Sequence, residues 1–418
     1  MREDHEVKKR LAILLALALV VSLLAACGQT AQPTATQPAP TAKPAAPTAQ
    51  PTQEVKAPII IGGITDLSGN GSVLGIAVNQ GWKLAVADIN AKGGIDGREV
   101  KLITYDCKSD PQEAITLFNR LADVDKVSIV VGPPFSNVGL AVAPVADEKG
   151  LVFFGQFGDP RCMLGEKLDS LHPYMFLVQP SAIQSGIISG AYPFEKMGLK
   201  KAAVLIAEDH SYCSTQAKAF IEYAGKVGIE IVTVQKCKIA DTDMTVQLTA
   251  IKNSGAEFLF NATPTQPLVI STNQMYQMGI DMVKCGSLDF SNPFATLVSD
   301  PKAASKIWFP VNLDMEAAYL DPVEAAYIAA YGQNPTPKSW IAYDTILVTA
   351  AAVEKAGSVD RKAIRDALEN ISGVDTLITD NFRMDPATHM PLGLEMCIYS
   401  IENAVYKNTG WFVPEYLK

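Results

Sequence analysis

Short runs rich in branched apolar residues alternate with helix-length amphipathic segments through most of this 418-residue chain. Such alternation is typical of strand–helix units whose parallel strands form a sheet covered by helices on both faces. The first series predicts strands at residues 59–64, 100–105, 128–131 and 151–154, with helices at 73–90, 111–123 and 138–149. The fold class is therefore predicted to be α/β.

The alternation starts again near Ser181, with strands expected at 202–207, 230–235, 257–260 and 282–285 and helices at 184–197, 214–227, 244–253 and 268–278. The roughly 360 residues from Pro58 onward are more than one hydrophobic core normally serves. We therefore expect two doubly wound, Rossmann-like lobes that face one another across a cleft. Helices expected at 322–331, 339–355 and 361–370 and strands at 397–401 and 404–407 indicate a chain that returns to complete both lobes.

The N-terminus has the pattern of an export signal. A charged opening precedes an apolar block, Leu11 to Leu24, that is too short to span a bilayer comfortably. It ends in Leu24-Ala25-Ala26-Cys27, which resembles a bacterial lipobox and predicts lipidation of Cys27 after removal of residues 1–26. Residues 27–57, rich in Pro, Thr, Ala and Gln, are predicted to form a disordered linker. An ordinary secreted protein with a chance cysteine is the alternative.

Charge and cysteine content narrow the partners. The net charge is −9, and removal of four basic and three acidic residues with the signal makes it −10, which argues against nucleic acid. Six cysteines follow Cys27, none with metal-ligand spacing, and they allow fifteen connectivities. Cys213 and Cys237 are the favoured disulfide pair because both fall just past the carboxyl ends of successive predicted strands.

Catalytic and cofactor motifs are absent from the sequence. It contains no nucleophile elbow, phosphate-binding loop or H-E-x-x-H pattern. The glycines after the first strand are spaced G-x-G-x-x-x-G, which does not match the dinucleotide fingerprint, so no cofactor and no enzymatic activity are expected. His210 follows Glu208 and Asp209 in the sequence. The three side chains could form an acid–base group, but we favour the alternative that they form a solvated rim.

Several motifs in order resemble the leucine/isoleucine/valine-binding protein family, the extracytoplasmic receptors of branched-chain amino-acid-type ABC transporters. They are Ile64-Thr-Asp-Leu-Ser-Gly, Asp88-Ile-Asn-Ala-Lys-Gly-Gly-Ile-Asp-Gly-Arg98, Tyr105-Asp-Cys-Lys-Ser-Asp-Pro111, Gly132-Pro-Pro-Phe-Ser136 and Glu208-Asp-His-Ser-Tyr212. The resemblance implies two lobes joined by three crossover segments, one from 58–180 plus 311–385 and the other from 181–310 plus 386–418. It also implies a small-molecule ligand, permease and ATPase partners, and a monomer.

The family's site residues carry over at some positions and not at others. Ser136 matches a serine that binds the ligand carboxylate, supported by helix-start amides such as that of Asn137; capping of the helix is its alternative role. A second carboxylate-binding residue, usually threonine, is Gly158 here, in a loop with Gln156. The aspartate that binds an α-ammonium is Ala182.

Without that aspartate, either Asp289 supplies the negative charge or the ligand has no α-ammonium, because an unpaired buried ammonium is costly. Tyr212 matches a tyrosine that packs over the ligand, and Leu74 and Thr263 fall at further contact positions. Phe135 and Phe157 are aromatic pocket residues or core. The ligand class implied is a small carboxylate with an apolar or aromatic body.

Three functions are compatible with these residues. The first is a lipid-anchored solute receptor outside the cell membrane that delivers its ligand to a permease. The second is a sensory receptor of the same fold that signals to a partner. The third, an exported enzyme, lacks a nucleophile or metal set in the sequence.

Overall fold

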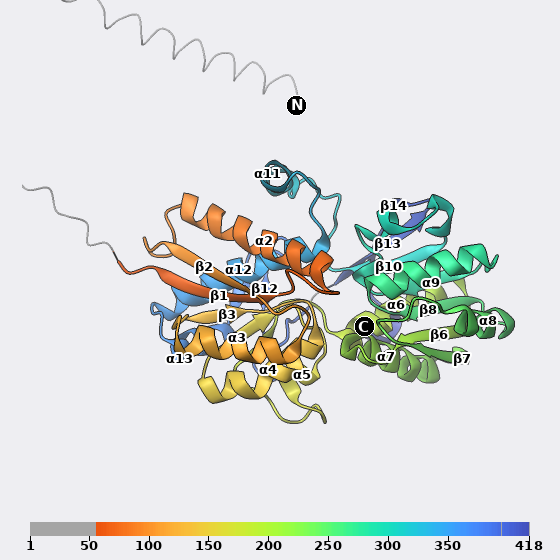
Figure 1. Cartoon of the computed structure of the whole chain (residues 1–418), viewed down its shortest axis with the longest axis horizontal. Helices are drawn as coiled ribbons and strands as arrows, with labels where there is room; N and C mark the ends of the chain where they lie inside the picture. The colour runs from red at the N-terminus through yellow and green to blue at the C-terminus, as the bar shows by residue number, and fades with distance from the viewer. Residues whose placement is uncertain (1–55, 394, 418) are drawn as a thin grey trace, which may run out of the picture. The chain divides into compact units, whose positions relative to one another are not determined.

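The computed structural model describes residues 56–393 and 395–417, which form two α/β lobes, each with its own sheet (Figure 1). Cys27, the predicted signal and nearly all of the predicted linker lie outside these residues. The five strands of lobe 1 are parallel, in the order β2-β1-β3-β4-β5. The seven strands of lobe 2 run in the order β14-β13-β10-β9-β8-β6-β7. The predicted fold class, two doubly wound lobes, is confirmed.

Lobe 1 follows the first predicted series. Pro111 at the start of α3 and the Asp110 carboxylate, which accepts from the Gln112 N–H at 2.8 Å, show how local sequence sets a helix boundary. The elements are β1 (Ile59–Thr65), α2 (Ser72–Ala91), β2 (Val100–Asp106), α3 (Pro111–Asp123), β3 (Ile129–Val131), α4 (Ser136–Lys149), β4 (Phe153–Gly155), α5 (Arg161–Leu164) and β5 (Met175–Leu177).

Lobe 2 follows the second series and adds an antiparallel edge. Strands β13 and β14 pair antiparallel with the otherwise parallel sheet. The elements are α6 (Ala182–Met197), β6 (Lys201–Ala207), α7 (Ser211–Val227), β7 (Glu230–Cys237), α8 (Thr245–Asn253), β8 (Phe258–Ala262), α9 (Thr265–Gln277), β9 (Val283–Gly286), α10 (Phe294–Leu297), β10 (Ile307–Val311), β13 (Met396–Glu402) and β14 (Val405–Phe412).

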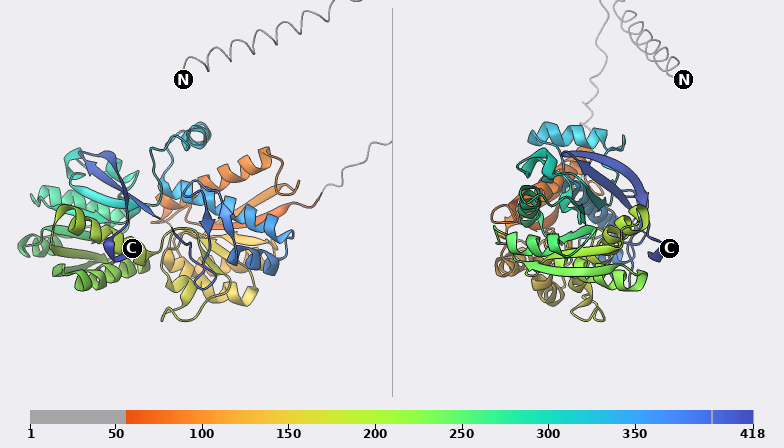
Figure 2. Two further views of the ribbon diagram at one scale, coloured as in Figure 1. Left: turned by 180° about the vertical axis from the view of Figure 1, so that it is seen from behind. Right: turned by 90° about the vertical axis from the view of Figure 1, so that its right-hand side faces the viewer.

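The last quarter of the chain serves both lobes, and Figure 2 shows its blue helices on lobe 1 and its blue strands on lobe 2. The segments between β10 and β13 are α11 (Asp321–Tyr331), α12 (Pro337–Ala356), α13 (Arg361–Glu369), β11 (Ser372–Val374) and β12 (Phe382–Arg383). The chain passes between lobes after β5, after β10 and after β12. The last passage comes later than residue 385, because His389 still stacks on Phe176 of lobe 1.

Each lobe has an aromatic core that fixes its strands. Trp82 of α2 and Phe154 of β4 are fully buried in lobe 1. In lobe 2, Phe220 of α7 stacks on Phe260 of β8 with ring centroids 4.3 Å apart. These cores hold the carboxyl ends of the strands in place, and the loops that follow those ends carry the candidate site.

The structure corrects the expected disulfide. Cys213 and Cys237 are both free, like the other cysteines of the described residues. Cys213 is in the first turn of α7 and Cys237 ends β7, and both thiols are packed into the apolar core of lobe 2. In this core the two free thiols pack as small hydrophobic side chains.

Candidate functional site

A small cavity of about 20 Å³ lies between the two lobes, and we call it the inner chamber. Its walls come from loops and helix starts next to the carboxyl ends of β1, β3, β6, β8 and β9, with one residue from the start of α12. Ligands of doubly wound sheets bind at this edge. The lining residues are Leu74, Pro134, Phe135, His210, Tyr212, Pro264, Leu288, Asp289 and Lys338.

A larger cavity of about 470 Å³, the outer chamber, shares Leu74, Phe135, His210 and Pro264 with the inner one. Most of its remaining wall is apolar, which suits a hydrophobic ligand body. Those residues are Asp66, Asn70, Gly71, Val73, Ser109, Asn137, Val138, Ile239, Thr265, Gln266, Pro267, Val269, Ile270 and Leu297.

Lys338 is the cation of the inner chamber. It is the second residue of α12 and only 6% exposed. Its Nζ donates to Gln179 Oε1 at 3.4 Å, and its carbonyl accepts from Gln156 Nε2 at 3.1 Å. Burial lowers the pKa of Lys338 to about 8, against the opposing effect of Asp289. The ammonium is thus held at the cavity wall with little compensation.

Asp289 is the anion of the same chamber. The Ser287 hydroxyl donates to Oδ2 at 2.5 Å, and the Thr265 hydroxyl donates to Oδ1 at 3.3 Å. These two lobe 2 hydroxyls orient the carboxylate. Each of its oxygens keeps a lone pair for a further donor.

The structure corrects the interpretation of His210 as a solvated rim residue. His210 is only 7% exposed and lines both chambers. Its Nδ1 accepts from the Cys213 N–H at 3.4 Å and so caps α7, while the Phe135 ring meets it edge-on at 6.3 Å. Burial lowers the pKa of His210. A neutral ring is consistent with its role as an acceptor.

Tyr212 crosses from lobe 2 to the Gly158 loop of lobe 1. A Cβ on Gly158 would lie 2.6 Å from the Tyr212 ring, so the tyrosine occupies the space that a threonine side chain would need. Burial also raises the pKa of the Tyr212 hydroxyl. Glycine at position 158, where the family usually has threonine, therefore leaves room for the Tyr212 ring.

Of the other predicted contacts, Leu74 and Phe135 line both chambers and Asn137 lines the outer one, whereas the rest line neither. Ser136 is fully buried, and its hydroxyl accepts from the Asp159 N–H at 3.1 Å inside lobe 1. Phe157 is fully buried in the lobe 1 core, in line with the core alternative, whereas Phe135 lines both chambers. The remaining ones that line neither chamber are Gln156, Gly158, Ala182 and Thr263.

Two sets of hydrogen bonds join the lobes beside the chambers. Asn137 Oδ1 accepts from the Ser211 N–H at 3.0 Å and from its hydroxyl at 2.6 Å. The Thr215 hydroxyl of α7 donates to the Asp159 carboxylate at 2.8 Å. These bonds require the lobes to be close together, so the structure corresponds to a closed arrangement.

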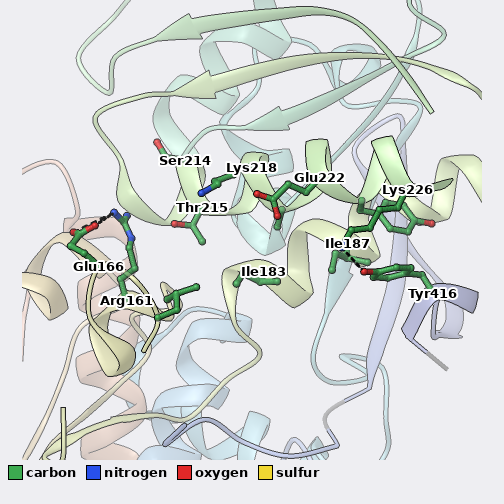
Figure 3. A pocket seen from close by; sticks show the side chains of 13 residues that line it. Arg161, Glu166, Ile183, Ile187, Ser214, Thr215, Lys218, Glu222, Lys226 and Tyr416 are labelled. Atoms are coloured by element: carbon green, nitrogen blue, oxygen red, sulfur yellow. Dashed lines mark hydrogen bonds and ion pairs between the residues drawn. The ribbon is translucent and has the colours of Figure 1, made fainter. Parts of the chain in front are cut away.

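Another cavity of about 410 Å³ lies where residues 161–168 of lobe 1 meet α6 and α7 of lobe 2 (Figure 3). Its lining charges are exposed, as in Lys218 and Glu222, or paired at the two ends of the cavity. Arg161 pairs with Glu166 at 3.2 Å at one end, and Lys226 donates to the Tyr416 hydroxyl at 2.7 Å at the other. It presents no buried charge to a ligand, and we favour the chambers between the strand ends as the site.

The described residues give no sign of a metal centre or a membrane span. Among residues 56–393 and 395–417, no cluster of three His, Cys, Asp or Glu side chains is arranged to hold an ion. In the same part of the chain, no helix is long and apolar enough to cross a bilayer.

Sequence reasoning missed Lys338 because it searched the loops after strands. One signal was available: Lys338 is the residue after Pro337, in the first turn of a helix, where the macrodipole disfavours a cation. A lysine at that position indicates a role other than helix stability.

Comparisons with known proteins agree with this geometry. A family model described as periplasmic binding protein matches residues 58–403. An amino acid binding protein of Pseudomonas aeruginosa is 27% identical over 310 residues, which cover 73% of this chain and 80% of the relative. The leucine-, isoleucine-, valine-, threonine- and alanine-binding protein of the same organism is 24% identical, covering 69% of this chain and 76% of the relative. The predicted resemblance is confirmed.

Solved structures share the fold. The branched-chain amino acid transporter substrate-binding protein of Streptococcus pneumoniae, in complex with isoleucine, matches with a TM-score of 0.75 at 25% identity, covering 84% of this chain and 99% of that one. A solute-binding protein of an ABC transporter from R. palustris, in complex with benzoate, matches with a TM-score of 0.75 at 19% identity, covering 85% and 97%.

Proposed function

The chain belongs to the periplasmic binding protein family, and we propose that it is the lipid-anchored substrate-binding receptor of an ABC transporter. In this role it captures an amino acid or related small carboxylate between its lobes outside the cell membrane. The closed form then delivers the ligand to a permease powered by an ATPase. The ligand favours closure because it binds the closed arrangement more tightly than the open one.

One observation carries the proposal: both chambers have walls from both lobes. Phe135 of lobe 1 and His210 of lobe 2 line the inner and the outer chamber alike. A ligand held there contacts both halves at once and stabilises the closed form. The amino acid binding protein of Pseudomonas aeruginosa and the isoleucine-bound structure support the ligand class.

Calorimetry and small-angle scattering test the function. The purified full-length chain is titrated with amino acids and with aromatic and aliphatic acids that lack an amino group. At least one compound is expected to bind and to preserve a compact particle that opens when the ligand is removed. Absence of binding and of any change in radius of gyration across the set would refute the proposal.

The lipid anchor is tested separately in the producing cells. Wild-type protein is expected in the membrane fraction, and C27A is expected to be released or to retain its signal because it lacks the lipidated thiol. Retention of correctly processed C27A in the membrane fraction would contradict the anchor without affecting the binding function.

A further inference from the structure

We propose that Lys338 is the specificity-determining residue of this receptor: its ammonium binds the ligand carboxylate in the inner chamber, while Asp289 accepts from a donor next to that carboxylate. The inference rests on the proposed function and assigns the head-group contacts within it. The ligand class is a carboxylic acid with an adjacent amino or hydroxyl group and an apolar body.

The first step is the position of the two charges. Lys338 reaches the inner chamber from lobe 1 and Asp289 reaches it from lobe 2. No ion pair joins them within 4 Å in the described part of the chain, where the one polar contact of the Lys338 ammonium is the long bond to Gln179. Two opposite charges that line one cavity without touching leave space for a group that bonds to both.

The second step is charge balance. With one ammonium, one carboxylate and a neutral His210, the chamber walls have no net charge. A carboxylate alone would gain from Lys338 and lose to Asp289. A carboxylate with a neighbouring donor gains from both, because the donor faces Asp289.

The third step is size. The inner chamber of about 20 Å³ has room for about one water-sized group in this closed arrangement, so a carboxylate with its neighbouring donor fits between Lys338 and Asp289 only when the lobes separate slightly. The outer chamber, about 470 Å³, begins at the shared residues Phe135 and Leu74 and accommodates the apolar body. Ser136 is fully buried and lines neither chamber, so Lys338 is the cationic group at the inner wall.

The experiment compares four probes that differ only in the head group: L-phenylalanine, L-3-phenyllactate, 3-phenylpropanoate and phenethylamine, with the matching leucine series as a second body. Wild-type protein is expected to bind the amino or hydroxy acid best and the amine without a carboxylate least. K338M is expected to weaken the best acid about 10- to 100-fold, with partial rescue by K338R.

Lys284 provides the matched control. It is also 6% exposed, but it is on β9 and lines neither chamber. K284M should leave the affinity for the best acid within about twofold, and D289N should reduce the preference for the substituted acid over 3-phenylpropanoate. Thermal unfolding of each variant confirms that it is folded.

The outcomes separate the inference from the function. Wild-type binding that survives in K338M would overturn the role of Lys338 while leaving the receptor function intact. Equal loss in K338M and K284M would also overturn it, because burial rather than the chamber contact would then be responsible. If wild-type protein binds none of these acids but binds another compound of the wider calorimetric set, the head-group assignment is overturned and the function stands; if it binds none of that set either, the function is refuted.

Discussion

Two pairs of buried basic residues have similar burial and different surroundings. Lys338 and His210 line the inner chamber, whereas Lys284 and His389 are packed away from both chambers. Burial lowers the pKa of all four. The degree of burial therefore does not distinguish a binding group from a structural one.

Hydrogen-bond capacity distinguishes the histidines, whereas each lysine ammonium makes one long bond, at 3.4 Å in Lys338 and 3.5 Å in Lys284, and only Lys338 borders a chamber. Both ring nitrogens of His389 are used, Nδ1 at 3.0 Å from the Met175 carbonyl and Nε2 at 3.2 Å from Glu369. His210 uses Nδ1 for its helix cap and faces the cavity. A buried basic group with unused capacity next to a cavity is the signature of a ligand contact.

The largest expected effect is on the pH dependence of binding, and it tests whether Lys338 is a ligand contact. Lys338, with a pKa of about 8, loses its proton in alkaline solution, so affinity for L-3-phenyllactate should fall about tenfold per pH unit above 8. Asp289, His210 and Tyr212 face the same chamber; burial lowers the pKa of His210 and raises that of the Tyr212 hydroxyl, so neither of these two groups loses a proton between pH 8 and 10. Calorimetry from pH 7 to 10 measures the effect; a flat profile in wild-type protein, or an equal slope in K338R, would contradict it.

Removing either lysine should stabilise the ligand-free protein. The pKa of each is lowered from 10.5 to about 8, so each ammonium destabilises the fold below pH 8 by up to about 3 kcal/mol, a cost that disappears as pH rises toward 10.5. K338M and K284M should both raise the free energy of unfolding at pH 7 in urea titrations. A destabilised K338M would show instead that its ammonium holds the fold together.

How far the sequence predicts this molecule depends on the kind of feature. The strand–helix alternation predicted the lobes because amphipathic periodicity is local, and 111–123 matches α3. The alternation did not predict β5, which is only three residues long, or β10, which contains Pro310. The family resemblance suggested Phe135, Tyr212 and Asp289, all of which line the inner chamber.

The same reasoning could not find Lys338, because the packing of α12 against α2 brings a helix start to the strand ends from far along the chain. His210 was misjudged because its charged neighbours suggest exposure, whereas the opposite lobe covers it. Contacts between the lobes depend on how distant segments pack together, and a local sequence pattern does not show this. Ser136, in turn, bonds within its own lobe.

A smaller effect separates the two histidines. Because burial lowers both pKa values below 6.5, the unfolded chain takes up protons first, and stability falls as pH drops below 6.5. H210N retains a capping acceptor for α7 and should remove the His210 part, at most about 2 kcal/mol at pH 5. Urea titrations at pH 7 and 5 measure it; an unchanged acid sensitivity in H210N would contradict a contribution from His210.

The smallest effect tests whether closure maintains the environment of Lys338. N137A removes the bonds to Ser211 that join the lobes, at a cost of about 1 kcal/mol, and should shift the ligand-free protein toward an open form. Opening rehydrates Lys338, so its pKa should rise toward 10.5, while the pKa of Lys284 stays at about 8 because its surroundings belong to one lobe. Lysine Nζ NMR titrations follow both groups in the same sample. If the two pKa values move together, or if neither moves although scattering shows opening, then the low pKa of Lys338 arises within lobe 1 and not from the opposing wall of the cleft.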